Sequence, residues 1–292
     1  MQDHRIPFNG LELQVRDHPH PGQPILFLHF SGANLRMWSA AAPYFQDRYR
    51  LLLVDLRGHG RSSRPDSGYH LDHLADDLAA LLDALDLPHA HVIGSSLGAE
   101  AGLALAANYP EKVSSLVLDG ALSSEYGPYS TWDGSEAEFE SFVREQLAGL
   151  QASPQKTFPT MEALLGNRQG VLEPYGWWNE HVAAMLRYGA YPLSEGHYIP
   201  GLHRAALLDY MGHYFRNRLE DYYPRLHCPV LMLPGESDQD DPAEMAVIEK
   251  LRDLAPQAEI AAMPGWQHPY GWLVDPEPAC RAVLDFLDKT SP

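Results

Sequence analysis

The sequence predicts an α/β fold in which a mostly parallel, twisted sheet carries helices on both faces. Short apolar runs that are typical of buried strands alternate with helical segments over residues 24–119 and again over residues 229–292. Alternation at this spacing indicates βαβ units, whose strands are buried on both faces. Between these two regions, the alternation of strand and helix patterns stops. We therefore expect a core formed by residues 1–122 and 224–292, with a helical lid inserted at residues 123–223.

In the first half of the chain, an antiparallel hairpin is expected around Gly10, because residues 11–15 alternate apolar and polar side chains. Continuous apolar runs predict buried strands at residues 24–29 and 50–55. The clearest amphipathic helix follows them. Its apolar face carries Leu74, Leu78, Leu81, Leu82 and Leu85.

Further strands are expected at residues 91–93, 113–119, 229–233 and 259–263. Two helices of the second half have clear start signals, an aspartate cap followed by proline, whose missing N–H costs nothing at the first helical position. These pairs are Asp241-Pro242 and Asp275-Pro276. Within the lid the helical patterns are strongest over residues 136–150 and 203–215.

Composition excludes several classes of function. The 292 residues carry a formal net charge of −18, which disfavours binding to phosphate backbones and anionic membrane surfaces. The two cysteines cannot form a disulfide framework, and the sequence shows neither a signal peptide nor a long apolar span. We expect a cytoplasmic protein that acts on a small molecule, with no metal, no cofactor and no implied partner protein.

The stretch from Val92 to Gly98 is the most informative motif. Gly94, Ser96 and Gly98 fit the pattern G-x-S-x-G, a strand-turn-helix elbow that holds a serine on a strained backbone. Side chains at the two glycine positions would collide with the neighbouring strand or helix. The serine hydroxyl is then exposed at a helix N-terminus, where backbone N–H groups stabilise developing negative charge.

A serine hydroxyl needs a base, and the base needs a third group that fixes its tautomer. Loops at the carboxyl ends of parallel strands meet at one edge of the sheet. Asp238 and His268 each follow such a strand and are the expected partners of Ser96. Asp119 ends the strand after the elbow and is the alternative carboxylate, ranked below Asp238 because it can cap the entry to the lid.

Taken together, the motifs resemble those of the α/β-hydrolase superfamily, in its lid-bearing branch of esterase, lactonase, perhydrolase and C–C hydrolase-like enzymes. The resemblance rests on the elbow, on the chain order Ser, Asp, His, and on four further stretches. These are Leu28-His29 with its Ser/Gly loop, Asp55-Leu56-Arg57-Gly58-His59-Gly60-Arg61-Ser62, Gly235-Glu236-Ser237-Asp238, and Gly265 through His268.

The resemblance implies that Ser96 is the nucleophile, His268 the general base and then acid, and Asp238 the orienting carboxylate. It also implies that the Leu97 N–H is one oxyanion donor. Relatives have glycine after the strand-ending histidine, where this chain has Phe30. By position the second donor is the N–H of Ser31, with that of Phe30 as the alternative.

These observations predict a serine hydrolase that cleaves a small to medium carboxylic ester or lactone. The many aromatic residues of the lid predict an apolar pocket, with Phe30, Trp266 and Trp177 as candidate substrate contacts. C–C bond hydrolysis and cofactor-free perhydrolysis use the same residues. A ligand-binding protein on a hydrolase fold is the alternative from another class, and rapid turnover of an ester would count against it.

Overall fold

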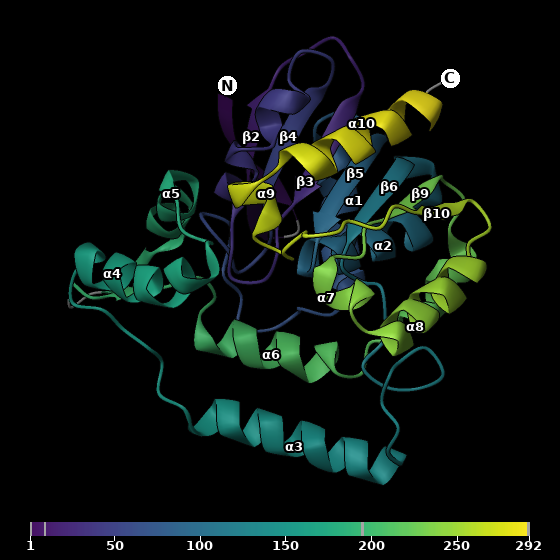
Figure 1. Cartoon of the computed structure of the whole chain (residues 1–292). Helices are drawn as coiled ribbons and strands as arrows, with labels where there is room; N and C mark the ends of the chain where they lie inside the picture. Colours follow the sequence, from purple (N-terminus) through teal and green to yellow (C-terminus); the bar gives the residue numbers. More distant parts are fainter. Residues whose placement is uncertain (1, 9, 194–195, 291–292) are drawn as a thin grey trace.

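An eight-stranded sheet lies at the centre of the computed structural model, which describes residues 2–8, 10–193 and 196–290 (Figure 1). Its strand order is β1-β2-β4-β3-β5-β6-β9-β10. The β1–β2 and β2–β4 pairs are antiparallel, and every pair from β4 to β10 is parallel. The strands are β1 (Gln2–Phe8), β2 (Leu11–His18), β3 (Pro24–Leu28), β4 (Arg50–Asp55), β5 (Ala90–Ser95), β6 (Val113–Asp119), β9 (Val230–Met232) and β10 (Ala258–Ile260). The predicted parallel sheet is therefore confirmed.

Both faces of the sheet are covered, and the side chains of each strand alternate between two core clusters. In β3, Leu26 and Leu28 pack with α1 and α2, whereas Ile25 and Phe27 pack on the α10 side. Figure 1 shows α10 crossing the near face of the sheet. The core helices are α1 (Leu71–Ala84), α2 (Leu97–Asn108), α7 (Glu236–Gln239), α8 (Pro242–Asp253), α9 (Gly271–Val274) and α10 (Glu277–Thr290). Across the described ranges, no helix is both long enough and apolar enough to span a membrane.

Helix boundaries agree with one of the two proline signals and differ at the other. Helix α8 begins at Pro242, and its Asp241 cap accepts a hydrogen bond (2.9 Å) from the N–H of the second helical residue. Helix α10 begins at Glu277, so the expected start at Pro276 behind Asp275 is one residue early. Differences of this size are usual where the first turn lacks its own backbone bonds.

Between β6 and β9 the chain forms mainly helices. They are α3 (Glu136–Ala152), α4 (Met161–Leu172), α5 (Glu180–Gly189) and α6 (Arg204–Tyr214). A small hairpin of β7 (Tyr191–Pro192) and β8 (Tyr198–Ile199) accompanies them, although the sequence predicts no strand in this segment. In Figure 1, α6 runs across the end of the sheet near α7, and α3 lies outside α6.

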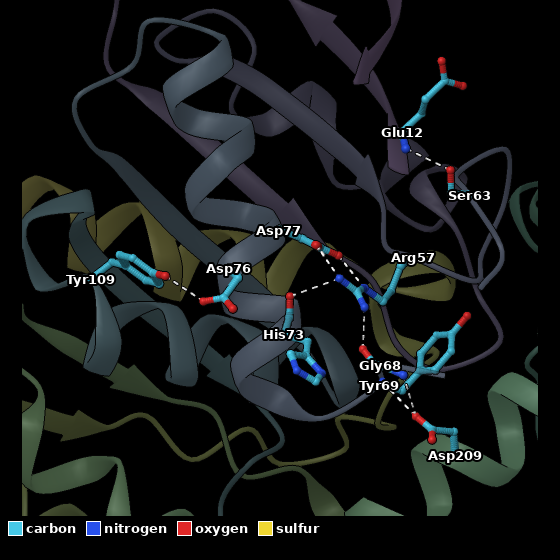
Figure 2. A network of polar contacts seen from close by, with 10 residues as sticks. All are labelled: Glu12, Arg57, Ser63, Gly68, Tyr69, His73, Asp76, Asp77, Tyr109 and Asp209. Carbon is cyan, nitrogen blue, oxygen red and sulfur yellow. Dashed lines mark hydrogen bonds and ion pairs between the residues drawn. The ribbon is translucent and has the colours of Figure 1, made fainter. Parts of the chain in front are cut away.

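The loop after β4 connects this helical segment to the core (Figure 2). Arg57 donates from Nε to Asp77 of α1 (2.5 Å) and from Nη1 to the carbonyl of Gly68 (2.6 Å). The backbone N–H groups of Gly68 and Tyr69 donate in turn to the Asp209 carboxylate of α6, both at 2.9 Å. One continuous polar network therefore fixes α6 relative to α1.

Candidate active site

Ser96 occupies the turn between β5 and α2. Its backbone angles are φ 51° and ψ −120°, in the strained region that residues other than glycine rarely adopt. A Cβ at Gly94 would lie 2.3 Å from the carbonyl oxygen of Gly98, and a Cβ at Gly98 would lie 2.1 Å from the carbonyl oxygen of Leu28. Both glycines of the motif are thus required by close backbone approach.

Replacing Gly98 with alanine is expected to lower the free energy of unfolding by about 3 kcal/mol, because backbone atoms must move to admit the methyl group. Gly166→Ala is the matched control, since this helical glycine in α4 has nothing within 4 Å of the added Cβ. Gly166→Ala should stabilise the protein by about 0.5–1 kcal/mol through helix propensity. Urea titrations of the two variants measure both effects, and equal stabilities would contradict the close approach at the elbow.

His268 lies beside the serine. A Cβ at Gly120, whose φ is +107°, would lie 2.9 Å from Ser96 Cα and 3.3 Å from His268 Cε1. Only a glycine at this position leaves room for the imidazole next to the elbow. The Ser96 N–H donates to the carbonyl of Asp119 (2.6 Å), so the end of β6 is bonded directly to the turn.

The carboxylate that bonds the imidazole is Asp119. His268 Nδ1 donates to Asp119 Oδ1 (2.8 Å), whereas Asp238 Oδ2 accepts from the backbone N–H of Gly235 (2.8 Å). The expectation that Asp238 orients His268 is therefore wrong. The reason is strand order: β6 pairs directly with β5, and in that register Asp119 stands opposite Ser95.

Asp119 is fully buried, with an exposed fraction of 0%, and four donors converge on its two oxygens. The donors are His268 Nδ1 (2.8 Å), Trp266 Nε1 (3.2 Å), Trp272 Nε1 (2.7 Å) and the Ser95 hydroxyl (2.6 Å). Burial raises the pKa of Asp119, but the charge of His268 and these hydrogen bonds outweigh burial and hold the pKa below its usual value. The carboxylate is thus ionised and held in one orientation.

The ion pair with Asp119 also changes the pKa of His268. Burial lowers the pKa of His268, but the charge of Asp119 and the hydrogen bond to it prevail and raise the pKa above its ordinary value. Its side chain keeps 30% of its surface exposed, whereas that of Asp119 keeps 1%. An imidazole with Nδ1 bonded to a carboxylate presents Nε2 as the atom that accepts a proton.

The predicted oxyanion loop follows β3 and contacts the start of α2. A Cβ at Gly98 would also lie 2.9 Å from the carbonyl oxygen of His29, so residues 29–32 lie close to the elbow helix. The Gly32 N–H donates to His59 Nε2 (2.9 Å) and is already used. The N–H groups of Leu97 and of Ser31, or alternatively Phe30, remain the predicted donors.

His29 and His59 support this loop from below. His29 Nδ1 donates to the carbonyl of Phe30 (2.8 Å), and its Nε2 accepts from the N–H of Leu56 (3.1 Å). Burial lowers the pKa of His29 to about 4, and burial also holds the pKa of His59 well below its usual value. Both rings are therefore neutral and use both nitrogens in hydrogen bonds.

A cavity of about 160 Å³ lies beside Ser96 and His268, and its lining includes both residues and Gly120. The predicted substrate contacts do not line it. Trp266 has only 4% of its surface exposed and donates to Asp119, while Trp177 stacks on Tyr270 (5.1 Å between ring centroids). Phe30 also packs against Tyr270, with 5.6 Å between their ring centroids.

The expected apolar pocket is also incorrect. Four carboxylates line the cavity, and the aromatic residues of the insert pack mainly elsewhere. Several of them form a separate cluster around α3, in which Phe142 contacts Trp132, Phe139 and Phe215, and Trp132 also contacts Phe139. These side chains stabilise the insert and do not line the cavity at Ser96.

The family model of the alpha/beta hydrolase fold matches residues 23–270. The chain belongs to this family. It is similar to 2-(acetamidomethylene)succinate hydrolase of Mesorhizobium japonicum, with 29% identity over 97% of this chain and 94% of that protein. It is also similar to a bifunctional esterase/perhydrolase of Acinetobacter calcoaceticus, with 26% identity over 89% and 90% of the two chains.

Among solved structures, this hydrolase is similar to a crystal structure of E-2-(acetamidomethylene)succinate hydrolase. The TM-score is 0.77 at 27% identity, covering 98% of this chain and 99% of that chain. The similarity includes both the sheet and the helical insert, because the two chains match over nearly their whole length.

Three residues of this hydrolase donate hydrogen bonds to the Asp119 carboxylate, and the sequence does not predict this role for them. They are Ser95, Trp266 and Trp272, which all donate to it. One signal was available: Trp266 and Trp272 flank His268 at short distance in the sequence and are placed by the same loop and by α9. Ser95 carried no separate signal, because the motif selects its neighbour.

Proposed function

We propose that this hydrolase cleaves a small carboxylic ester or lactone through an acyl-enzyme formed on Ser96. The observation that carries the proposal is the hydrogen bond from His268 to the buried Asp119, beside a serine held at a strained elbow. A nucleophile, a base and a fixed acceptor for that base are the three parts that acyl transfer requires.

In the first half-reaction, Ser96 Oγ attacks the substrate carbonyl and His268 Nε2 takes the hydroxyl proton. The N–H groups of Leu97 and Ser31 stabilise the oxyanion of the tetrahedral intermediate. The intermediate collapses when the C–O bond to the leaving alcohol breaks and His268 returns the proton to that oxygen. An alcohol leaves from an ester, whereas the alcohol of an opened lactone stays attached.

In the second half-reaction, His268 takes a proton from water, and the hydroxide attacks the acyl carbon. Collapse breaks the bond to Ser96 Oγ, which regains its proton from His268, and the carboxylic acid leaves. Throughout, Asp119 stays ionised and keeps the imidazole in the tautomer that has Nε2 free.

An ester is preferred because one relative is named an esterase/perhydrolase and because a cavity of about 160 Å³ suits a small group. A cavity of roughly 150 Å³ holds benzene. The succinate in the name of the Mesorhizobium japonicum relative is not carried over to this chain. Succinate derivatives are acids, and the cavity of this hydrolase is itself lined by carboxylates.

A fluorophosphonate probe tests the proposal directly. We expect a single adduct on Ser96, located by peptide mapping, and none in the Ser96→Ala variant. Ser237→Ala is the matched control, since this exposed serine lines the same cavity and should leave labelling unchanged. An adduct at another serine, or no adduct together with no turnover of an ester and lactone panel, would reject the acyl-enzyme.

A further inference from the structure

The cavity beside Ser96 is strongly acidic. Four carboxylates from separate elements line it: Glu100 of α2, Glu125 of the segment after β6, Asp238 of α7 and Glu244 of α8. Among the described residues that line this cavity there is neither Lys nor Arg. A substrate group that enters this cavity therefore meets several acidic side chains, and His268 is the basic side chain among the described lining residues.

Glu100 is the most deeply buried of the four, with 6% of its surface exposed. It lies four residues after Ser96, in the first turn of α2, and both residues line the cavity. Its Oε2 is 3.5 Å from the Tyr210 hydroxyl, the outer limit of a hydrogen bond. This carboxylate has no strong donor of its own within the described chain.

The other three carboxylates have neutral donors. Glu125 accepts from the Tyr214 hydroxyl, and Asp238 accepts from a backbone N–H. Glu244 accepts from the side chain of Ser123. Hydrogen bonds of this kind orient a carboxylate but leave its charge in place. Within the described ranges, none of the four forms a salt bridge, which is unusual for charges this close to a buried site.

The carboxylates of this cavity also repel one another. Burial raises the pKa of Glu100 to about 8, and the charge of Glu125 adds to the rise, so this carboxyl is largely protonated at neutral pH until a cation lowers its pKa. Burial likewise raises the pKa of Glu244, and the charge of Asp238 adds to it. A cation in the cavity would reverse both effects, because each carboxylate would gain the opposite charge that it lacks.

A second observation points to a bound molecule in the same place. Asn217 lines the cavity, and its buried Nδ2 has no hydrogen-bond partner within the described residues. An unpaired buried amide is costly unless a ligand or water completes it. The Nδ2 group can donate a hydrogen bond to a substrate oxygen, while the carboxylates contact a positive group.

We propose that this cavity selects a substrate with a small cationic group, such as a primary or methylated ammonium, and disfavours anionic substrates. The inference rests on the proposed function, because it concerns the substrate of the same Ser96 site. The volume of about 160 Å³ limits the cationic group to roughly the size of one ring. Charge, not apolar area, is then the feature that distinguishes good substrates from poor ones.

Two series of esters with matched shape test this selection. With the charge on the alcohol, the set is 2-(trimethylammonio)ethyl acetate, the neutral 3,3-dimethylbutyl acetate and the anionic 2-sulfoethyl acetate. With the charge on the acyl group, it is the methyl esters of 4-(trimethylammonio)butanoate, 5,5-dimethylhexanoate and 4-sulfobutanoate. In at least one series we expect kcat/KM for the cation to exceed that of the neutral ester by about tenfold or more, with the anion slowest.

Charge removal provides the decisive variants. Glu100→Gln, Glu125→Gln and Glu244→Gln should each bring the cation-to-neutral ratio of kcat/KM closer to one. Glu249→Gln is the matched control, because it removes one charge from an exposed position of the same helix as Glu244 and should leave the ratio unchanged. If all four variants keep the cation-to-neutral ratio of the parent enzyme, these carboxylates do not select the substrate and the proposal is overturned.

A readout without turnover separates this inference from the proposed function. Tetramethylammonium chloride should raise Tm more than sodium chloride at equal ionic strength, and Glu100→Gln should remove the difference. Neutral esters that are hydrolysed without any cationic preference, together with no such rise in Tm, would reject the inference and leave the proposed function intact. A rise in Tm without hydrolysis of any ester would support cation binding and reject the proposed function.

Discussion

Ser96→Ala is expected to lower kcat for ester hydrolysis by roughly 10⁴–10⁶-fold while KM changes little. The hydroxyl forms a bond only in the transition state and the acyl-enzyme, so its loss removes catalysis and leaves the cavity intact. Initial rates with an activated ester measure the effect. Circular dichroism should show an unchanged fold, because the strained backbone of Ser96 is set by Gly94 and Gly98 and not by the hydroxyl.

Ser237→Ala controls for loss of any hydroxyl at the cavity, and its kcat should stay within about twofold of the parent enzyme. Near-normal turnover by Ser96→Ala would instead mean that water attacks the substrate directly or that another group is the nucleophile. In either case the acyl-enzyme proposal would be rejected, although membership of the family would stand.

Much of the core could be predicted because its signals are local. In β3 and in residues 51–54 of β4, adjacent apolar residues pack on opposite faces of the sheet, so each strand appears in the sequence as a continuous apolar run. The elbow is equally local, since Gly94 and Gly98 are required by atoms within the same turn and by the strand beside it. Sequence patterns of this kind span only a few neighbouring residues and can therefore be recognised without knowledge of the fold.

The partner of His268 could not be settled in that way, because it depends on strand order. Asp119 and Asp238 both follow parallel strands, and sequence alone does not say which strand lies beside β5. In the sheet β6 lies next to β5, so Asp119 at the end of β6 is within hydrogen-bond distance of the His268 imidazole. Asp238 has instead a local role, as a cap on the N–H of Gly235 in the same short helix.

The polarity of the cavity depends on contacts between distant segments. Glu100 and Glu244 are separated by 144 positions in the printed sequence, yet both line the same cavity. The aromatic richness of the insert gave the wrong expectation, because Trp132 and Phe139 pack against one another around α3. A composition says how much apolar surface must be buried, but not whether it is buried against the substrate or against itself.

Asp119→Asn is expected to lower kcat by about 10⁴-fold, whereas Asp238→Asn should keep kcat within about tenfold. An asparagine can turn its NH₂ toward His268 Nδ1, which favours the tautomer with the proton on Nε2 and removes the base. Its one carbonyl oxygen also cannot accept from all four donors that Asp119 satisfies, so Tm should fall as well. Activity is therefore compared at a temperature where thermal denaturation shows both variants folded.

The pH profile distinguishes the electrostatic role of Asp119 from a purely structural one. In the parent enzyme kcat/KM should rise with pH through an apparent pKa above 6.5, because the charge of Asp119 raises the pKa of His268 and only the neutral imidazole is a base. In Asp119→Asn the burial of His268 is unopposed by that charge, so the pKa falls and the acid limb of the residual activity moves to lower pH. Asp238→Asn should move it in the same direction by less, since Asp238 makes the smaller contribution to the pKa of His268. A larger loss and a larger shift in Asp238→Asn than in Asp119→Asn would return Asp238 to the role that the sequence first suggested.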